Sequence, residues 1–114
     1  MEVQSPKDIS NIKELKAMKN NDQINFQIMT KDNNFVISTI IKNSITQKIY
    51  EGIFSLKEIQ NNKYFLQFDS IQEIFEELVF KSQTEFPTIK EENENLILKI
   101  LLSSSKFKDI EFTL

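Results

Sequence analysis

The sequence predicts an α+β domain: an antiparallel β-sandwich or curved sheet of about six strands, with an extra N-terminal helix. Two observations predict this class. Apolar and polar residues alternate on both sides of the centre, as in half-buried strands, while the centre itself has helical spacing. The predicted order is therefore a β-meander, a helical insert and a second β-meander. In a chain of 114 residues we expect residues 1–7 to be a flexible lead and residues 8–114 to form one globular domain.

The N-terminal helix is predicted over about residues 9–19. Asp8 is a candidate N-cap residue, and the polar run at 20–22 is a candidate helix end. The evidence between them is a narrow apolar stripe at intervals of three residues, made by Ile9, Ile12, Leu15 and Met18. Because the stripe is thin, we expect this helix to lie across an edge or an end of the fold.

The first meander follows directly after this helix. Strands are predicted over about residues 24–28, 35–41 and 45–54. Apolar and polar residues alternate in the first, the second is β-branched and aromatic throughout, and the third has isoleucines among polar neighbours. Polar clusters at 31–34 and 43–44 supply the turns. Gly52 within the third strand predicts a bulge or a close backbone contact.

The helical insert has clear start signals. Ser55 and Ser70 are each followed three residues later by a glutamate, which is the pattern of a capping box. We expect a short helix after Ser55 and a longer one over about 70–82, whose apolar face is Ile71, Ile74, Phe75, Leu78 and Val79. The aromatic segment 63–68 between them is either a short strand or a buried irregular segment.

In the second meander, apolar and polar residues again alternate along the chain with a period of two. Strands are predicted over about 88–90, after Pro87, and over about 96–102, with a polar turn at 91–95. A turn at Ser103–Ser105 leads to a last strand with Ile110, Phe112 and Leu114 facing inward.

The composition excludes most catalytic chemistry. Without cysteine or histidine there is no thiolate nucleophile, imidazole base or Cys/His zinc site, and a single glycine excludes a glycine-rich phosphate loop. The glutamates of residues 91–94 are interpreted as a solvated turn and not as a carboxylate pair or calcium loop. We therefore expect no enzyme activity, no catalytic or metal-binding residues and no cofactor.

The charge pattern argues against binding of a nucleic acid. The net charge is −3, all 14 basic residues are lysines, and they are dispersed along the chain, so the bidentate arginine contacts common at phosphates are absent. Tyr64, Phe65 and Phe68 beside Lys63 could stack on bases, but core packing explains them better. No apolar run approaches the length of a membrane span and the N-terminus has no signal pattern, so we expect a cytoplasmic protein, with cytoskeletal association as a further expectation.

Two classes of function remain. The first is a non-enzymatic protein–protein interaction or assembly domain, a scaffold whose partners are other proteins or, as a weak homodimer, a second copy of the chain. The ten phenylalanines favour it, since aromatic residues are enriched at binding hot spots. The alternative is a small-molecule or nucleic-acid binding module that uses an apolar groove near the helical insert.

The middle and end of the chain carry a family pattern. Residues 50–56 lead into a short capped helix, residues 65–69 lead into a longer amphipathic helix, a strand starts over 95–98, and residues 107–114 close the chain. Over about residues 24–114 this order resembles the globular head of the centriolar cartwheel protein and its relatives, the scaffold proteins of DNA end joining.

The resemblance implies an antiparallel β-sandwich with a helix-turn-helix inserted mid-sheet, and an assembly function. Two departures accompany it: those heads continue into a dimerising coiled coil whereas this sequence stops at Leu114, and the N-terminal helix is not part of the pattern.

Phe107 is the candidate interface residue, together with Lys106 and Lys108. The resemblance implies that Phe107 occupies the place of an aromatic residue that docks into a neighbouring head. Its own surroundings agree, because it follows three serines and sits between two lysines near a polar tip. The other interpretation is that Phe107 begins the last strand and points into its own core.

Overall fold

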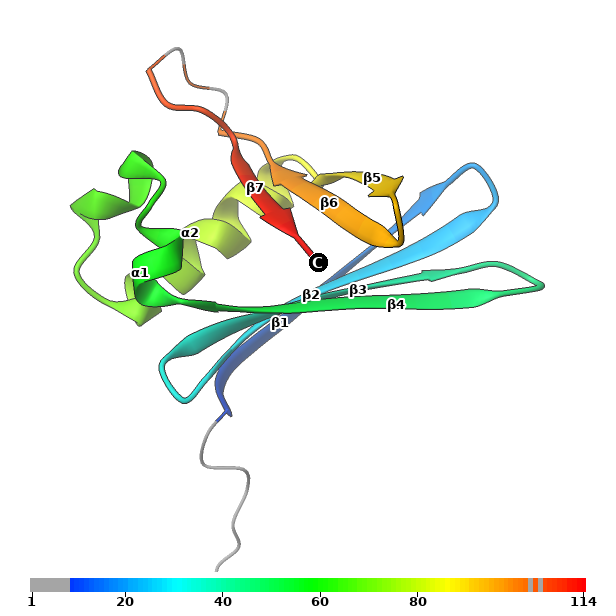
Figure 1. Ribbon diagram of the computed structural model, residues 1–114, viewed down its shortest axis with the longest axis horizontal. Helices are drawn as coiled ribbons and strands as arrows, with labels where there is room; N and C mark the ends of the chain where they lie inside the picture. The colour runs from blue at the N-terminus through cyan, green and yellow to red at the C-terminus, as the bar shows by residue number, and fades with distance from the viewer. Residues whose placement is uncertain (1–8, 103, 105) are drawn as a thin grey trace, which may run out of the picture.

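Two antiparallel sheets and a group of helices make up the computed structural model, which describes residues 9–102, 104 and 106–114 (Figure 1). Sheet A has the strand order β1-β2-β3-β4 and sheet B the order β5-β6-β7. The strands of sheet A are β1 (Ile9–Lys19), β2 (Asp22–Lys31), β3 (Asn34–Lys42) and β4 (Gln47–Ser55). Those of sheet B are β5 (Thr88–Glu92), β6 (Asn95–Ile100) and β7 (Ile110–Thr113). The α+β class with two antiparallel meanders is confirmed.

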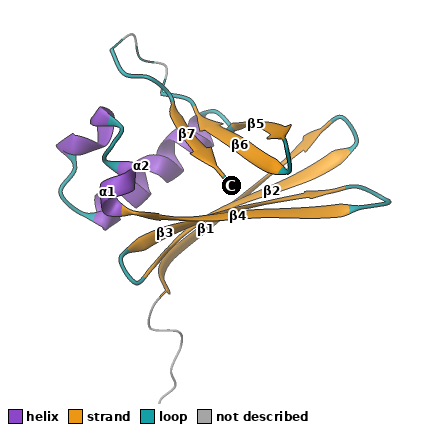
Figure 2. Ribbon diagram, viewed as in Figure 1, coloured by secondary structure: helices purple, strands orange, loops and turns teal. Residues whose placement is uncertain are grey.

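The helical insert lies between the two meanders in sequence and at one end of the sandwich in space (Figure 2). It consists of α1 (Leu56–Ile59), the 3₁₀ helix η1 (Lys63–Gln67) and α2 (Ile71–Thr84). Ser55 caps α1 with both bonds of a capping box, and Ser70 accepts from the Glu73 N–H to cap α2. Segment 63–68 is therefore largely a 3₁₀ helix, and neither a strand nor irregular.

The expected N-terminal helix over about 9–19 is wrong, because these residues form strand β1. β1 pairs antiparallel with β2 along its length, from Ile9 opposite Lys31 to Lys19 opposite Asp22. The stop signal at Asn20 is in fact a hairpin turn, in which Asn20 has the positive φ of 57° that asparagine tolerates. As an edge strand with one solvent-facing side, β1 shows little of the alternation that marks central strands. The described residues thus form seven strands where about six were expected.

The turns of two other hairpins, β2–β3 and β5–β6, are also tighter than expected. Asp32 and Asn33 both have positive φ, as do Asn93 and Glu94, which suits two-residue loops of the type that match the twist of the strands. The polar turn predicted at 91–95 therefore consists of only Asn93 and Glu94. Glu91 and Glu92 belong to β5. The expected flexible lead, with Asp8, lies outside the described residues, as do two of the three serines at 103–105.

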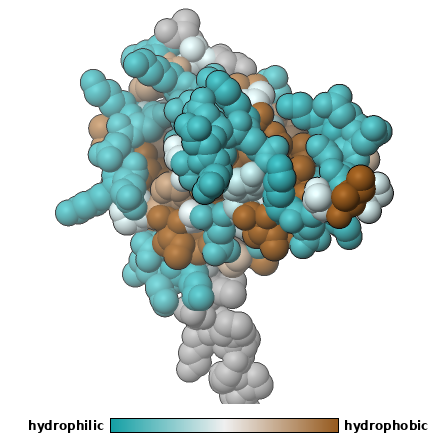
Figure 3. Space-filling view, turned by 45° about the vertical axis from the view of Figure 1, so that its right-hand side comes forward, coloured by the Kyte–Doolittle hydropathy of each residue, from teal (hydrophilic) through white to brown (hydrophobic). Residues whose placement is uncertain are grey.

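The core lies between the sheets and under α2. Ile74, Phe75 and Leu78 of α2 are buried against the inward-facing residues of both sheets, as the amphipathic stripe predicted. The largest fully buried side chains include Phe26, Phe35, Phe65, Leu96 and Leu98. On the face shown in Figure 3, apolar side chains lie in separate patches among hydrophilic ones. Large apolar side chains that remain exposed are Ile12, Met18, Ile45, Ile49, Ile53, Leu66 and Phe80.

Candidate functional site

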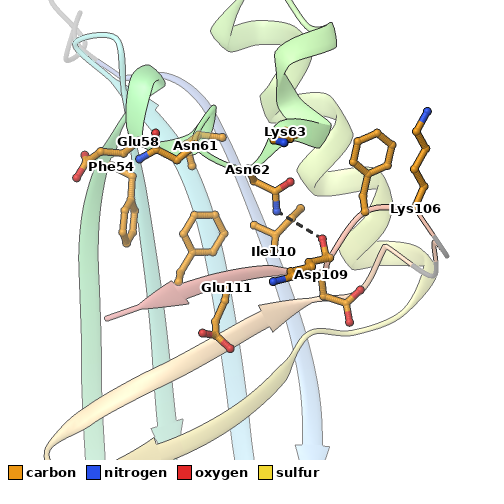
Figure 4. Close-up of a pocket in the computed structure, with 13 residues that line it drawn as sticks. Phe54, Glu58, Asn61, Asn62, Lys63, Lys106, Asp109, Ile110 and Glu111 are labelled. Atoms are coloured by element: carbon orange, nitrogen blue, oxygen red, sulfur yellow. Dashed lines mark hydrogen bonds between the residues drawn. The ribbon is translucent and has the colours of Figure 1, made fainter.

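A groove of about 710 Å³ lies between the helical insert and the segment that leads into β7 (Figure 4). One wall runs from Phe54 at the end of β4, through α1, to Lys63 at the start of η1. The other wall is the segment 106–112. A hydrogen bond joins the walls, with the Asn62 Nδ2 donating to the Lys108 carbonyl oxygen at 3.5 Å. The groove is therefore formed only when the insert and the C-terminal strand come together.

The floor of the groove is aromatic and aliphatic. The rings of Phe54 and Phe112 pack with centroids 4.9 Å apart, and Ile59 and Ile110 are buried beside them. Gly52 makes this possible, because a Cβ there would lie 2.8 Å from the Phe54 ring. The close neighbour of Gly52 is therefore a side chain, the ring of Phe54, and not the backbone contact that was expected, and the β3–β4 register has no bulge there.

Phe107 stands at the end of the groove nearest η1. Its side chain is half-buried, and its ring packs edge-on against Tyr64, with centroids 5.4 Å apart. The Ser104 Oγ accepts hydrogen bonds from the backbone N–H groups of Lys106 and Phe107, at 3.0 and 3.1 Å. The Lys106 ammonium lies 5.6 Å from the Phe107 ring centroid. The backbone that carries Phe107 is thus held in place while one side of the ring remains open.

Tyr64 connects this site to α2. Its hydroxyl donates a hydrogen bond to the Glu77 carboxylate, and its ring also packs against Phe65 and Phe68. Burial, together with the bond to Glu77, raises the pKa of the Tyr64 hydroxyl to about 12. Tyr64 therefore stays neutral over the physiological range and acts as a support for Phe107. Of the two interpretations of the 63–68 aromatics, packing is the role this geometry gives them.

The rim of the groove carries both signs of charge in equal number. Lysines Lys63, Lys106 and Lys108 line it together with the acids Glu58, Asp109 and Glu111. Asp109 has a structural role as well, since its carboxylate accepts the Leu102 N–H at 2.8 Å. A rim of this kind has no net attraction for a polyanion, but it can form ion pairs with a partner surface of mixed charge.

The three residues singled out in the sequence are thus together in one site. Lys106, Phe107 and Lys108 all line the groove, and Phe107 is neither fully exposed nor fully buried. Sequence reasoning missed the opposite wall, which Phe54, Asn61 and Asn62 build. The only signal for that wall was the capping box at Ser55, which fixes where the chain turns out of β4.

A second polar cluster ties the two sheets together. The Glu91 carboxylate on β5 accepts from the Tyr50 hydroxyl at 2.6 Å and pairs with the Lys48 ammonium at 3.0 Å, both on β4. These bonds lower the pKa of Glu91, and the same bonds to Glu91 raise the pKa values of Tyr50 and Lys48. Because all three side chains are accessible to solvent, the cluster is a surface link between sheets.

The described part of the chain also bears on metal binding and on membrane spanning. Those residues hold no group of three or more acidic side chains placed to bind a metal ion. Within the same residues, no helix has both the length and the apolar character needed to cross a membrane. In comparisons with known proteins, no family model, no curated protein and no solved structure matches the chain.

Proposed function

We propose that this chain is a non-enzymatic protein–protein interaction domain, and that its groove receives an apolar side chain of a partner protein. The observation that carries the proposal is Phe107, an aromatic side chain held on a fixed backbone with one side of its ring open beside an apolar groove. Half-exposed aromatic groups flanked by charged rims are typical of binding hot spots.

The order of the elements supports the same proposal. The expected N-terminal helix was one of two departures from the cartwheel-head pattern, and a strand occupies those residues instead. The structure has four strands before the helical insert and three after it, in two antiparallel sheets. In the heads that the sequence resembles, the residue at the place of Phe107 docks into a neighbouring copy, so a weak homodimer is the first assembly to test.

A small-molecule site is the second candidate, and the groove volume favours it. Sites for small ligands usually enclose about 300–1,000 Å³ and are mostly apolar with a few polar groups, and this groove of about 710 Å³ has that character. A nucleic acid is the weaker version of this alternative, because three acids offset the three lysines of the rim.

The test measures self-association of the purified chain. Amide NMR spectra and sedimentation are recorded over a concentration series. We expect resonances of Phe54, Phe107 and Ile110 to shift as concentration rises, and the average mass from sedimentation to rise with them. Phe107→Glu should abolish the shifts of the groove resonances, because a charge would replace the aromatic group at the contact.

Phe80→Glu is the matched control, because Phe80 is 58% exposed on α2 and does not line the groove. That variant should associate as the wild type does. Groove resonances that stay fixed at every concentration would exclude a homodimer formed through the groove. If they move instead on addition of small aromatic fragments at constant mass, the small-molecule alternative would hold.

A further inference from the structure

Strand β1 is long and lies at an edge of sheet A. It has 11 residues, against five in β5 and four in β7, and it forms one edge of sheet A. Among the described residues, no strand pairs with its outer side. Two large apolar side chains on it are exposed, Ile12 at 57% and Met18 at 68%. Such an edge offers free backbone groups to any strand of suitable pattern.

The register with β2 shows which backbone groups are free. Lys19 and Asp22 flank the two-residue loop of the β1–β2 hairpin and form its closing pair. Hydrogen-bonded and non-bonded positions alternate along an antiparallel pair, so residues 11, 13, 15, 17 and 19 bond to β2. The residues between them have N–H and C=O groups that point away from β2, toward the open side of the edge. These residues are Ile12, Glu14, Lys16 and Met18.

We propose that β1 pairs antiparallel with β1 of a second copy of this chain, about a two-fold axis at Leu15. In this register Ile12 faces Met18 of the second copy, and Glu14 faces its Lys16. By symmetry the same contacts occur twice, so both exposed apolar groups are covered and both charges are paired. Leu15 meets its own copy at the axis, and the flanking Lys13 faces Ala17. No two like charges face each other.

The neighbouring registers lack this match. A shift of the axis to Glu14 sets two glutamates opposite each other, and a shift to Lys16 sets two lysines opposite each other. On β4, the other edge of sheet A, the register that pairs Ile49 with Ile53 places Glu51 against its own copy. Lysines on an edge strand usually prevent pairing, but Lys16 of β1 has a glutamate to meet.

Charge exchange on the full chain tests the proposal directly. Sedimentation of the wild type over a concentration series should show a monomer–dimer equilibrium. Glu14→Lys and Lys16→Glu should each weaken the dimer about tenfold, since each sets two like-charged pairs across the strands. The double variant Glu14→Lys/Lys16→Glu should recover the wild-type affinity to within a few fold. Glu51→Lys, on the exposed face of β4, is the matched control and should leave the equilibrium unchanged.

Hydrogen exchange identifies the edge. On dilution, the amides of Glu14 and Lys16 should lose protection, while those of Lys13 and Leu15 keep it because they bond to β2. A thermal melt of each variant checks that it is folded, and exposed charges on an edge strand should leave it so.

The two proposed surfaces give different outcomes. Phe107→Glu leaves β1 intact, so the β1 dimer should persist in that variant. A wild type that remains monomeric into the millimolar range would overturn the β1 proposal. A double variant that associates no better than the single variants would also overturn it. A dimer that Phe107→Glu abolishes and the β1 variants leave intact would refute β1 pairing and support the groove.

Discussion

The core under α2 and the groove beside β7 are built from the same kinds of side chain, yet one is filled and the other is hollow. Under α2, Ile74 and Leu78 are completely buried because a helix covers both sheets there. At the groove, Phe54 and Phe107 are only half-buried because α1 has a single turn and the opposite wall is an extended segment. The difference indicates that α2 supplies stability while the groove is available for binding.

Removal of a filled core side chain should give the largest effect. Phe75 on α2 is 8% exposed and belongs to the central cluster. Phe75→Ala should lower the free energy of unfolding by about 3–5 kcal/mol, a large part of the roughly 5–15 kcal/mol typical of a domain. Phe80→Ala, on the exposed side of the same helix, should cost far less. Urea unfolding measures both, and equal losses would contradict the assignment of α2 as the core helix.

The half-buried aromatic of the groove should matter less for folding. Phe107→Ala removes a half-buried ring that packs against Tyr64 and against the edge of the central cluster. We expect a loss of about 1 kcal/mol, roughly half of the value for full burial, and a loss of any partner contact. A cost close to that of Phe75→Ala would show that Phe107 is a core residue. The measurement is the urea midpoint, with Leu66→Ala on η1, 62% exposed, as the control.

Within the filled core, replacement of one buried polar atom should increase the stability of the fold. The Thr39 hydroxyl on β3 is completely buried and has no hydrogen-bond partner among the described residues. Thr39→Val keeps the shape and removes the unsatisfied group, so we expect a stabilisation of about 1 kcal/mol. Differential scanning calorimetry detects it as a higher melting temperature. A lower melting temperature would mean that the hydroxyl has a partner, such as a buried water.

The sequence specified the filled region better than the hollow one. α2 was predictable because its cap at Ser70 and its apolar stripe are local signals that agree with each other. β1 was not, because an edge strand has little alternation and its pairing with β2 decides its structure. Phe107 and its lysines were found as a cluster in sequence, whereas the wall at Phe54 required knowledge of the tertiary contact.

The smallest expected effect is the pH dependence of stability that comes from Tyr64, the residue that links the groove to α2. Tyr64 packs against Phe107 and donates to Glu77 of α2, and its pKa rises to about 12, above the ordinary value of 10.0. Between these values the unfolded chain ionises this hydroxyl while the folded chain retains the proton. Stability should therefore be fully present below pH 10 and fall as the pH rises toward 12.

Tyr64→Phe removes this ionisation, so its free energy of unfolding should decline less steeply than that of the wild type over that range. The slope is the diagnostic quantity, because loss of the bond to Glu77 also lowers stability at neutral pH. Tyr50→Phe is the control: the pKa of Tyr50 is also raised, chiefly by its bond to Glu91, but that hydroxyl is exposed and should change the slope less. Equal slopes for wild type and Tyr64→Phe would contradict a raised pKa of Tyr64, and with it the burial and the bond to Glu77 that cause the shift.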